Sequence, residues 1–273
     1  MVLNWSILLW TIAASIYLAP QATKPSDALS AQSVRTIQIA IDADCDALIE
    51  NRAHQRLGFD PQTAKVVNEI PGARILDREN AAMFVLPYDP TGKLYTIRVT
   101  GRSTTDANVT MTGPGFVIGV RQLHLKSGKT ETIAMSSAGE VSLTATEDGP
   151  TAQVFLTAQS GRSAPSYRFE VAAAFLSRGK TMTVALVMTG GGILRFNSDE
   201  RKPVSFSVNM RRTNPSGSRD VYAHRNISFG KTNSYLMDFR EWNGKGEMPF
   251  CELGPWDDQR CQGFKNEAVE SKN

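Results

Sequence analysis

Apolar and polar residues alternate with a period of two along most of the chain after residue 34. The segments LYTIRVT (94–100) and PVSFSVNM (203–210) show the pattern most clearly, because every second residue is apolar. Such alternation is typical of a β-strand with one buried face and one solvated face. The same pattern predicts strands at Thr36–Asp42, Ala82–Pro87, Asn108–Thr112, Phe116–Leu125, Thr130–Met135, Val141–Ala145, Gln153–Ala158, Tyr167–Ala172, Met182–Met188, Ile193–Phe196, Val221–Phe229 and Ser234–Phe239.

Short strands at this spacing, without long amphipathic helices between them, favour antiparallel sandwiches over parallel α/β folds. We therefore predict an all-β protein of two antiparallel β-sandwich units in tandem, of the jelly-roll or immunoglobulin-like kind, with a C-terminal disulfide loop. The segment DALIENRAHQRLGF (46–59) is also compatible with a short helix, but a strand and a turn is the preferred interpretation.

The turn TGPG (112–115) is the best boundary between the two predicted units. It gives an N-terminal sandwich at 34–114 and a second sandwich at 115–253, followed by a C-terminal loop and tail at 254–273. A single larger β assembly is the alternative.

The first 22 residues differ from the rest, because Ile7–Ala19 is apolar and uncharged and is followed by Pro-Gln-Ala. This is typical of a signal peptide over residues 1–22, with a polar tether at 23–33. No Lys or Arg precedes the apolar run, so an uncleaved N-terminal anchor is the alternative. In either case we expect a secreted or extracytoplasmic protein, in a periplasm or at a cell surface. It would touch a membrane only through residues 1–19, and only if this segment is not cleaved.

The three cysteines agree with export. Cys251 and Cys261 flank a Gly-Pro turn, so in an oxidising compartment we expect them to form a disulfide. Cys45 is then left over, either as a buried free thiol or as one half of an intermolecular disulfide. The spacing of Cys and His does not fit a zinc site.

Charge does not indicate nucleic-acid binding. The chain has 30 Lys and Arg against 27 Asp and Glu, a net charge of +3, and the charges are scattered. The most basic stretch, MRRTNPSGSR (210–219), is rich in turn residues and is interpreted as a turn between two strands.

The segments GFDPQTAKVVNEIPGARI (58–75) and YDPTGKLYTIRVTG (88–101) resemble β-sandwich modules of secreted bacterial proteins. Such modules are often attached to extracellular hydrolases and usually have no catalytic residues of their own. The resemblance covers Ile37–Gly101, about a quarter of the chain. The pattern usually has Gly where this chain has His54 and Ala64. The resemblance implies a fold and an exported location, and it carries over no functional residue.

Residues 41–50 (IDADCDALIE) are the clearest candidate for metal chemistry. In a strand, Asp42, Asp44 and Asp46 would share one face. Together with Glu50 they would offer oxygen ligands to a calcium ion, although the spacing does not fit an EF-hand. The alternative is a solvated acidic edge that discourages pairing between sheets.

Aromatic residues gather near the C-terminus, where rings on a β-sandwich can stack on sugars. Trp256, beside two aspartates, is the ring most expected to be exposed, and Trp242 and Tyr235 are further candidates. The alternative, which is preferred for Phe239, Trp242 and Phe250, is that these rings fill the core beside the disulfide-closed loop.

No catalytic motif stands out, and the three histidines lie far apart in the sequence. The expected function is therefore a non-catalytic, exported binding or surface-associated protein, with a protein or polysaccharide as partner. The alternatives are a secreted carbohydrate-active or other hydrolase with a site assembled from scattered residues, and a purely structural protein-interaction module.

Overall fold

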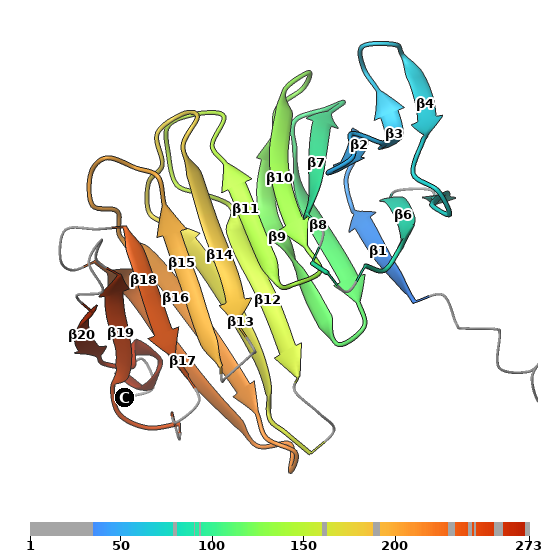
Figure 1. The fold of residues 1–273 in the computed structure, drawn as a ribbon. Coiled ribbons are helices and arrows are strands. Elements are labelled where there is room, and N and C mark those ends of the chain that lie inside the picture. Colours follow the sequence, from blue (N-terminus) through green and yellow to red (C-terminus); the bar gives the residue numbers. More distant parts are fainter. Residues whose placement is uncertain are drawn as a thin grey trace, which may run out of the picture. The chain divides into compact units, whose positions relative to one another are not determined.

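The computed structural model describes residues 35–78, 81–89, 91–92, 94–159, 163–187, 192–228, 233–239, 242, 244–253 and 259–270. The expected signal peptide and tether (1–33) lie outside them. The described residues form β-strands and one short helix, α1 (Glu267–Glu270) (Figure 1). The all-β prediction is thus confirmed. Within the described part of the chain, no helix is long and apolar enough to span a bilayer.

The strands form two antiparallel sheets, which we call sheet A and sheet B. Sheet A contains β1 (Thr36–Ile41), β5 (Arg74–Arg78), β6 (Ala81–Pro87), β8 (Thr105–Gly113), β9 (Phe116–Leu125), β12 (Gln153–Gln159), β13 (Ser166–Ala173), β16 (Phe206–Thr213) and β17 (Arg219–Ile227). Sheet B contains β2 (Cys45–Asn51), β3 (Arg56–Asp60), β4 (Lys65–Asn68), β7 (Leu94–Gly101), β10 (Thr130–Ser136), β11 (Glu140–Thr144), β14 (Thr181–Val187), β15 (Ile193–Ser198), β18 (Ser234–Asp238), β19 (Met248–Leu253) and β20 (Gln259–Phe264).

From β8 onward the chain alternates between the sheets in pairs of strands. The pair β8–β9 belongs to sheet A, β10–β11 to sheet B, β12–β13 to sheet A and β14–β15 to sheet B, and each pair lies beside the previous pair of its own sheet (Figure 1). The spatial order is β17-β16-β13-β12-β9-β8-β1-β6-β5 in sheet A and β20-β19-β18-β15-β14-β11-β10-β7-β2-β3-β4 in sheet B. Each new pair of strands therefore extends its own sheet by two strands.

The apolar faces of the two sheets meet in one continuous core. Its aromatic part joins both sheets, because Phe206 of β16 contacts Phe196 of β15 and Tyr235 of β18, with ring centroids 5.0 Å and 5.9 Å apart. Burial of alternate strand residues against the opposite sheet is the dominant force that holds the sandwich together.

Both sheets continue across the boundary expected at residue 115. That boundary falls in the turn between β8 and β9, and Gly113 pairs with Phe116 across it. In sheet B, β7 pairs with β10 from the other side of the boundary. Residues Arg35–Asn273 form a single compact unit, as in the alternative of one larger β assembly. The alternation of residues predicts which face of a strand is buried, but it does not predict which strand lies beside it.

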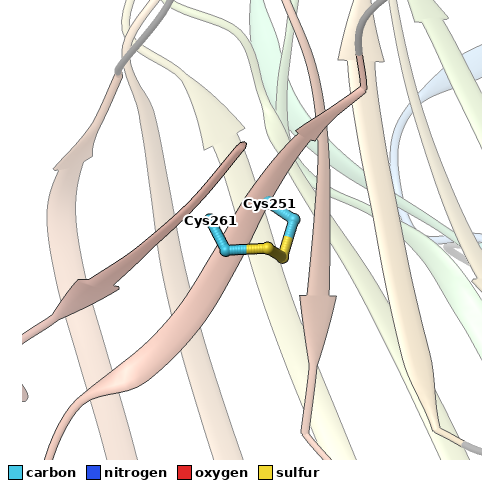
Figure 2. Close-up of a disulfide and its surroundings, with 2 residues drawn as sticks. All are labelled: Cys251 and Cys261. Carbon is cyan, nitrogen blue, oxygen red and sulfur yellow. A yellow bond between two sulfur atoms is a disulfide. The ribbon is translucent and has the colours of Figure 1, made fainter. Parts of the chain in front are cut away.

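The C-terminal disulfide is confirmed. Cys251 of β19 and Cys261 of β20 are direct cross-strand partners and are bonded to each other (Figure 2). The segment expected to be a loop and tail is more regular than predicted, because Gln259–Phe264 forms an edge strand of sheet B and α1 follows it. Cys45 is free and buried, as the first of its two interpretations expects.

Loss of the disulfide should destabilise the fold. Replacing both Cys251 and Cys261 by serine removes a constraint on the unfolded chain. For a loop this short, the constraint contributes about 2–3 kcal/mol to the free energy of unfolding. Thermal melts would show a lower melting temperature for the double variant. A reducing agent should lower the melting temperature of the unmodified protein and leave that of the double variant unchanged; an equal effect on both would contradict this role.

The free edge of β17 is covered by the segment after β20. The Asn266 amide accepts a hydrogen bond from the backbone N–H of Ala223 (3.0 Å) and donates one to the carbonyl of Val221 (2.7 Å). Glu267 accepts a further bond from the N–H of Arg225 (3.2 Å). These side chains satisfy backbone groups that would otherwise be available to another strand.

Candidate functional site

The acidic stretch 41–50 is shared between a turn and a strand. β1 ends at Ile41 and β2 begins at Cys45, so Asp42 and Asp44 lie in the connection and only Asp46 lies in a strand. The expectation that all three aspartates share one strand face is therefore wrong. A sequence that alternates acidic and apolar residues fits a strand equally well, and the turn between β1 and β2 has no Gly or Pro to mark it.

The carboxylates of this stretch bind protein donors. Asp42 accepts hydrogen bonds from the backbone N–H of Asn108 (2.6 Å) and from its side-chain amide (2.8 Å). Arg102 donates to Asp46 (2.5 and 3.0 Å) and to Asp44 (3.4 Å). Among the residues that the structure describes, no group of three or more His, Cys, Asp or Glu side chains is arranged to hold a metal ion. The geometry supports a role for this stretch in joining β1, β2 and β8.

Asp42 also supports an irregular position in sheet A. The pairing of β8 with β9 shifts between Ala107 and Val109, and Gln122 opposite the shift has a positive φ of 53°. Asn108, held by Asp42, accepts a hydrogen bond from the N–H of Gln122 (3.2 Å). The carboxylate thus fixes a β-bulge.

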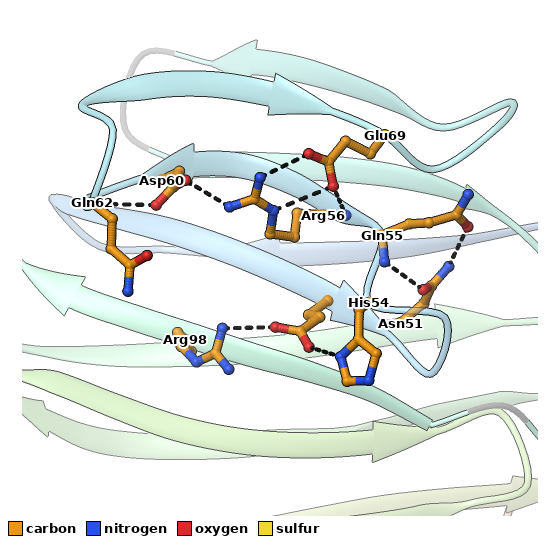
Figure 3. Close-up of polar contacts among 9 residues, drawn as sticks. Asn51, His54, Gln55, Arg56, Asp60, Gln62, Glu69 and Arg98 are labelled. Carbon is orange, nitrogen blue, oxygen red and sulfur yellow. Dashed lines mark hydrogen bonds and ion pairs between the residues drawn. The ribbon is translucent and has the colours of Figure 1, made fainter.

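Glu50, the fourth predicted ligand, lies between His54 and Arg98. It contacts His54 at 2.8 Å and accepts a hydrogen bond from Arg98 at 2.9 Å (Figure 3). The hydrogen bond to His54, together with that from Arg98, lowers the pKa of the Glu50 carboxyl. Burial raises the pKa of the Cys45 thiol, at the start of β2, to about 11, which disfavours the reactive thiolate form at neutral pH.

The motif that resembles secreted bacterial modules is organised around Arg56. Its guanidinium donates to Asp60 (2.7 Å) and to both carboxylate oxygens of Glu69 (2.8 and 3.2 Å) (Figure 3). Asp60 is buried and also accepts hydrogen bonds from the N–H of Gln62 and the hydroxyl of Thr63. The Asp-Pro-x-Thr and Asn-Glu parts of the motif therefore join β3 to the turns on either side of β4.

This cluster makes stability depend on pH. The backbone N–H of Gln62 lowers the pKa of Asp60, and the Arg56 side chain lowers the pKa of Glu69. A folded-state pKa below the unfolded value means that the stabilisation is present above the unfolded pKa and is lost as pH falls through the folded pKa. Between about pH 5 and pH 3, we expect the melting temperature of Arg56→Gln to fall less steeply than that of the unmodified protein. Arg52→Gln, an exposed neighbour, is the control and should keep the original slope.

The two positions where the related pattern has glycine adopt a left-handed backbone here. His54 has φ 59° and Ala64 has φ 52°. Glycine adopts this conformation without steric cost, whereas other residues lose about 1–2 kcal/mol. His54 and Ala64 therefore both adopt a backbone conformation that glycine favours, although neither is glycine.

Ala64→Gly should stabilise the protein. Relief of the left-handed strain outweighs the added freedom of the unfolded chain, for a net gain of about 0.5–1 kcal/mol. Ala53→Gly, in the exposed turn after β2 and without a positive φ, should be neutral or destabilising. Urea unfolding of both variants checks the sign, and a loss of stability in Ala64→Gly would contradict the explanation.

Two of the three aromatic candidates lie in the core. Tyr235 is fully buried, and Trp242 is 5 % exposed and packs edge-on against Tyr222 at 6.0 Å. Neither ring presents a face on which a sugar could stack, which corrects their assignment as ligand contacts. Trp256 lies outside the described residues. Alternation along the sequence predicts that a ring faces the core only when the ring lies in a recognised strand. Trp242 lies outside the strands, so the pattern could not predict its burial.

Each of the three histidines contacts a carboxylate. His54 pairs with Glu50 at 2.8 Å, His124 with Asp106 at 3.0 Å and His224 with Glu267 at 3.3 Å. Among the described residues, none of these rings makes a hydrogen bond to a serine, threonine or cysteine side chain. The first two pairs lie on the β2–β3 and β8–β9 hairpins and the third joins β17 to α1, so each histidine has its own carboxylate partner in a different part of the fold.

A pocket of about 420 Å³ opens where sheet A ends at its β8–β9, β12–β13 and β16–β17 turns. The described residues that line it include three arginines, several hydroxyl groups and a few apolar side chains, and no Asp or Glu. They are Thr112, Gly113, Gly115, Phe116, Val117, Thr157, Ala158, Ser166, Tyr167, Arg168, Arg211, Thr213 and Arg219.

Strand register places the polar lining residues in two rows on the outer face of sheet A. In the first row, Thr112, Val117, Thr157, Arg168 and Arg211 are direct partners from β8 to β16. In the second row, two residues further along the strands, Thr213 of β16 pairs with Ser166 and with Arg219. The three arginines thus come from three neighbouring strands. We call Arg168, Arg211 and Arg219 the arginine group.

The sequence prediction missed this site. The segment 210–219 was interpreted as a turn between strands, which the hairpin β16–β17 confirms. Its two outward arginines, however, join Arg168 from a segment far away in the sequence. The basic segment would have indicated a site only if its pairing with β13 had been known.

Comparison with known proteins adds no identification. No protein family, curated protein or solved structure matches the chain.

Proposed function

We propose that the chain is an exported, non-catalytic binding or surface-associated protein that holds its ligand in the pocket at the end of sheet A. One observation carries the proposal: hydroxyl, guanidinium and apolar groups from six strands converge on this pocket. Convergent polar groups around a partly apolar concavity are typical of ligand-binding sites.

The position of the pocket suits binding. Its lining side chains stand on paired strands, whose register fixes their spacing, so little conformational entropy is lost when a ligand binds. Thr157 illustrates this rigidity, because its hydroxyl contacts both the N–H (3.0 Å) and the carbonyl (2.9 Å) of Val117 on the neighbouring strand.

Export is supported by two independent features. The Cys251–Cys261 disulfide persists in oxidising compartments and is rare in reducing ones. The apolar run Ile7–Ala19 has the length of the hydrophobic part of a signal peptide. Fractionation of cells that express the chain with a C-terminal tag checks this part; a tagged protein found only in the cytoplasm would contradict it.

A thermal-melt screen tests ligand binding. The purified chain is melted with calcium, with a chelator, and with neutral and acidic cell-surface saccharides. A ligand that binds only the folded state adds about 2.7 kcal/mol of stability at a hundred times its dissociation constant. We expect a shift with a saccharide. A shift with calcium alone would favour a cation site at the acidic stretch, and no shift with any compound would contradict the binding function in favour of a purely structural protein.

A further inference from the structure

We propose that the arginine group binds the anionic part of a small organic ligand: a carboxylate, phosphate or sulfate carried on a ring, as in an acidic sugar. The inference rests on the proposed binding function and specifies the ligand class and the residues that recognise it. It follows from the charges, the register and the apolar part of the pocket.

The charges around the pocket are unbalanced. Arg168 is held by Glu170, with its Nε at 3.1 Å and its Nη2 at 2.8 Å from one carboxylate oxygen. Arg121 shares the same carboxylate at 3.4 Å and stacks over Phe155 at 4.7 Å, away from the pocket lining. Among the described residues, no carboxylate lies within ion-pair distance of Arg211 or Arg219. In the part of the chain that the structure describes, Glu170 is therefore the one carboxylate that pairs with any of Arg121, Arg168, Arg211 and Arg219.

The register brings like charges together. Arg168 and Arg211 are direct cross-strand partners in β13 and β16. Side chains at such positions have Cβ atoms about 4.5–5.5 Å apart, and like charges there destabilise the sheet. A local arrangement that costs stability is typical of a functional position. Glu170 balances the charge of Arg168, and an anion bound in the pocket would balance the charge of Arg211.

The donors fit an oxyanion. A guanidinium presents a planar fork of N–H groups that matches the paired oxygens of carboxylate, phosphate and sulfate. The second row adds Arg219 and the hydroxyls of Ser166 and Thr213, which can donate to further oxygens of the same group or to hydroxyls beside it. Because Asp and Glu do not occur among the described lining residues, an anion would meet no repelling carboxylate among them.

The apolar lining indicates that the ligand is larger than a bare anion. Phe116, Val117, Ala158 and Tyr167 line the same pocket. Tyr167 packs against Phe239 of the core, with ring centroids 4.7 Å apart, so its ring has a fixed position. A volume of about 420 Å³ accommodates a ring-sized ligand together with its charged group. Val117, which shares the outer face of sheet A with the arginines, would contact the ring while the arginines hold the anionic group. Phe116, Ala158 and Tyr167 stand in the adjacent, core-facing row and line the pocket from that side.

The test compares matched ligands by calorimetry. Glucuronate and glucose 6-phosphate carry an anion on a sugar ring, glucose is the neutral match, and inorganic phosphate and sulfate are the anions alone, all at one ionic strength set with chloride. We expect glucuronate or glucose 6-phosphate to bind, more tightly than the inorganic ions, and glucose not to bind. Equal affinity for glucose would overturn the inference, as would no binding of any of the anionic compounds.

Variants locate the site. Arg211→Gln and Arg219→Gln should each weaken binding of the preferred acidic sugar about tenfold or more, since each removes charged hydrogen bonds. Arg195→Gln, at an exposed position on β15 of sheet B, is the matched control and should leave the affinity unchanged. Equal weakening by all three variants would indicate a diffuse charge effect and overturn the assignment.

A second readout does not require a ligand. Because Arg211 opposes Arg168, Arg211→Gln should raise the melting temperature of the ligand-free protein while it weakens binding. A lower melting temperature would mean that Arg211 supports the fold, and would overturn the argument from repulsion. The two proposals can also fail separately. If a neutral saccharide from the thermal screen still raises the melting temperature of Arg211→Gln, the binding function is supported and the arginine group is excluded as the binding site.

Discussion

Replacing Phe206 with alanine should lower the free energy of unfolding by about 3–5 kcal/mol. Phe206 is fully buried and lies where the two sheets meet, in edge-on contact with Phe196 and Tyr235. Removal of the ring exposes a cavity between sheet A and sheet B and also removes aromatic contacts from both neighbours. Because these contacts join the sheets, the loss should appear in the cooperative unfolding of the whole described part of the chain.

Phe175→Ala is the matched control for that measurement. Phe175 is 48 % exposed, so the same chemical change there should alter stability by no more than about 0.5 kcal/mol. Urea unfolding followed by fluorescence and by circular dichroism gives both values. If the two variants lost the same stability, the aromatic contacts between the sheets would not be the source of the effect.

Gly58→Ala should cost about 3 kcal/mol or more. Gly58 lies in β3 at φ +119°, and a Cβ atom added there would lie 2.2 Å from the backbone carbonyl oxygen of Ala47 in β2. The obstructing atom belongs to the backbone of a paired strand, so the overlap cannot be relieved by a change of side-chain rotamer. The strand β3 would have to separate from β2.

Gly128→Ala distinguishes this overlap from backbone strain alone. Gly128 has φ +70°, and an added Cβ would meet nothing within 4 Å. Its replacement should cost about 1–2 kcal/mol, the ordinary price of a left-handed alanine. Equal losses at the two positions would show that the close approach of β3 to Ala47 contributes nothing.

The strands were predictable from the sequence because each buries one face. Residues 94–100 and 206–213 alternate apolar and polar side chains, and both are strands of the sandwich. The disulfide was predictable for a similar local reason, since the sequence between Cys251 and Cys261 contains the turn-favouring pair Gly254-Pro255. Neither inference needs information about which strand lies beside which.

Pairing between distant strands was not predictable, and the candidate site depends on it. Arg168 and Arg211 are adjacent only because β13 and β16 are neighbours, although the hairpin β14–β15 of the other sheet intervenes in the sequence. The acidic stretch shows the opposite error. Asp44 and Asp46 are close in the sequence and were assigned to a metal. Their partner is instead Arg102, which directly follows β7 and lies 58 and 56 residues further along the chain.

The alternation of strand pairs has a consequence for how such a protein can change its length. If β10–β13 were deleted, β9 would meet β16 in sheet A and β7 would meet β14 in sheet B, and both new pairs would still be antiparallel. Duplication of the same segment would likewise preserve every strand direction. Genetic gain or loss of such a four-strand segment would therefore lengthen or shorten the sandwich. The bulge between β8 and β9 and the capped edge at β17 would stay as they are. Solenoid proteins gain and lose whole repeats in a similar way.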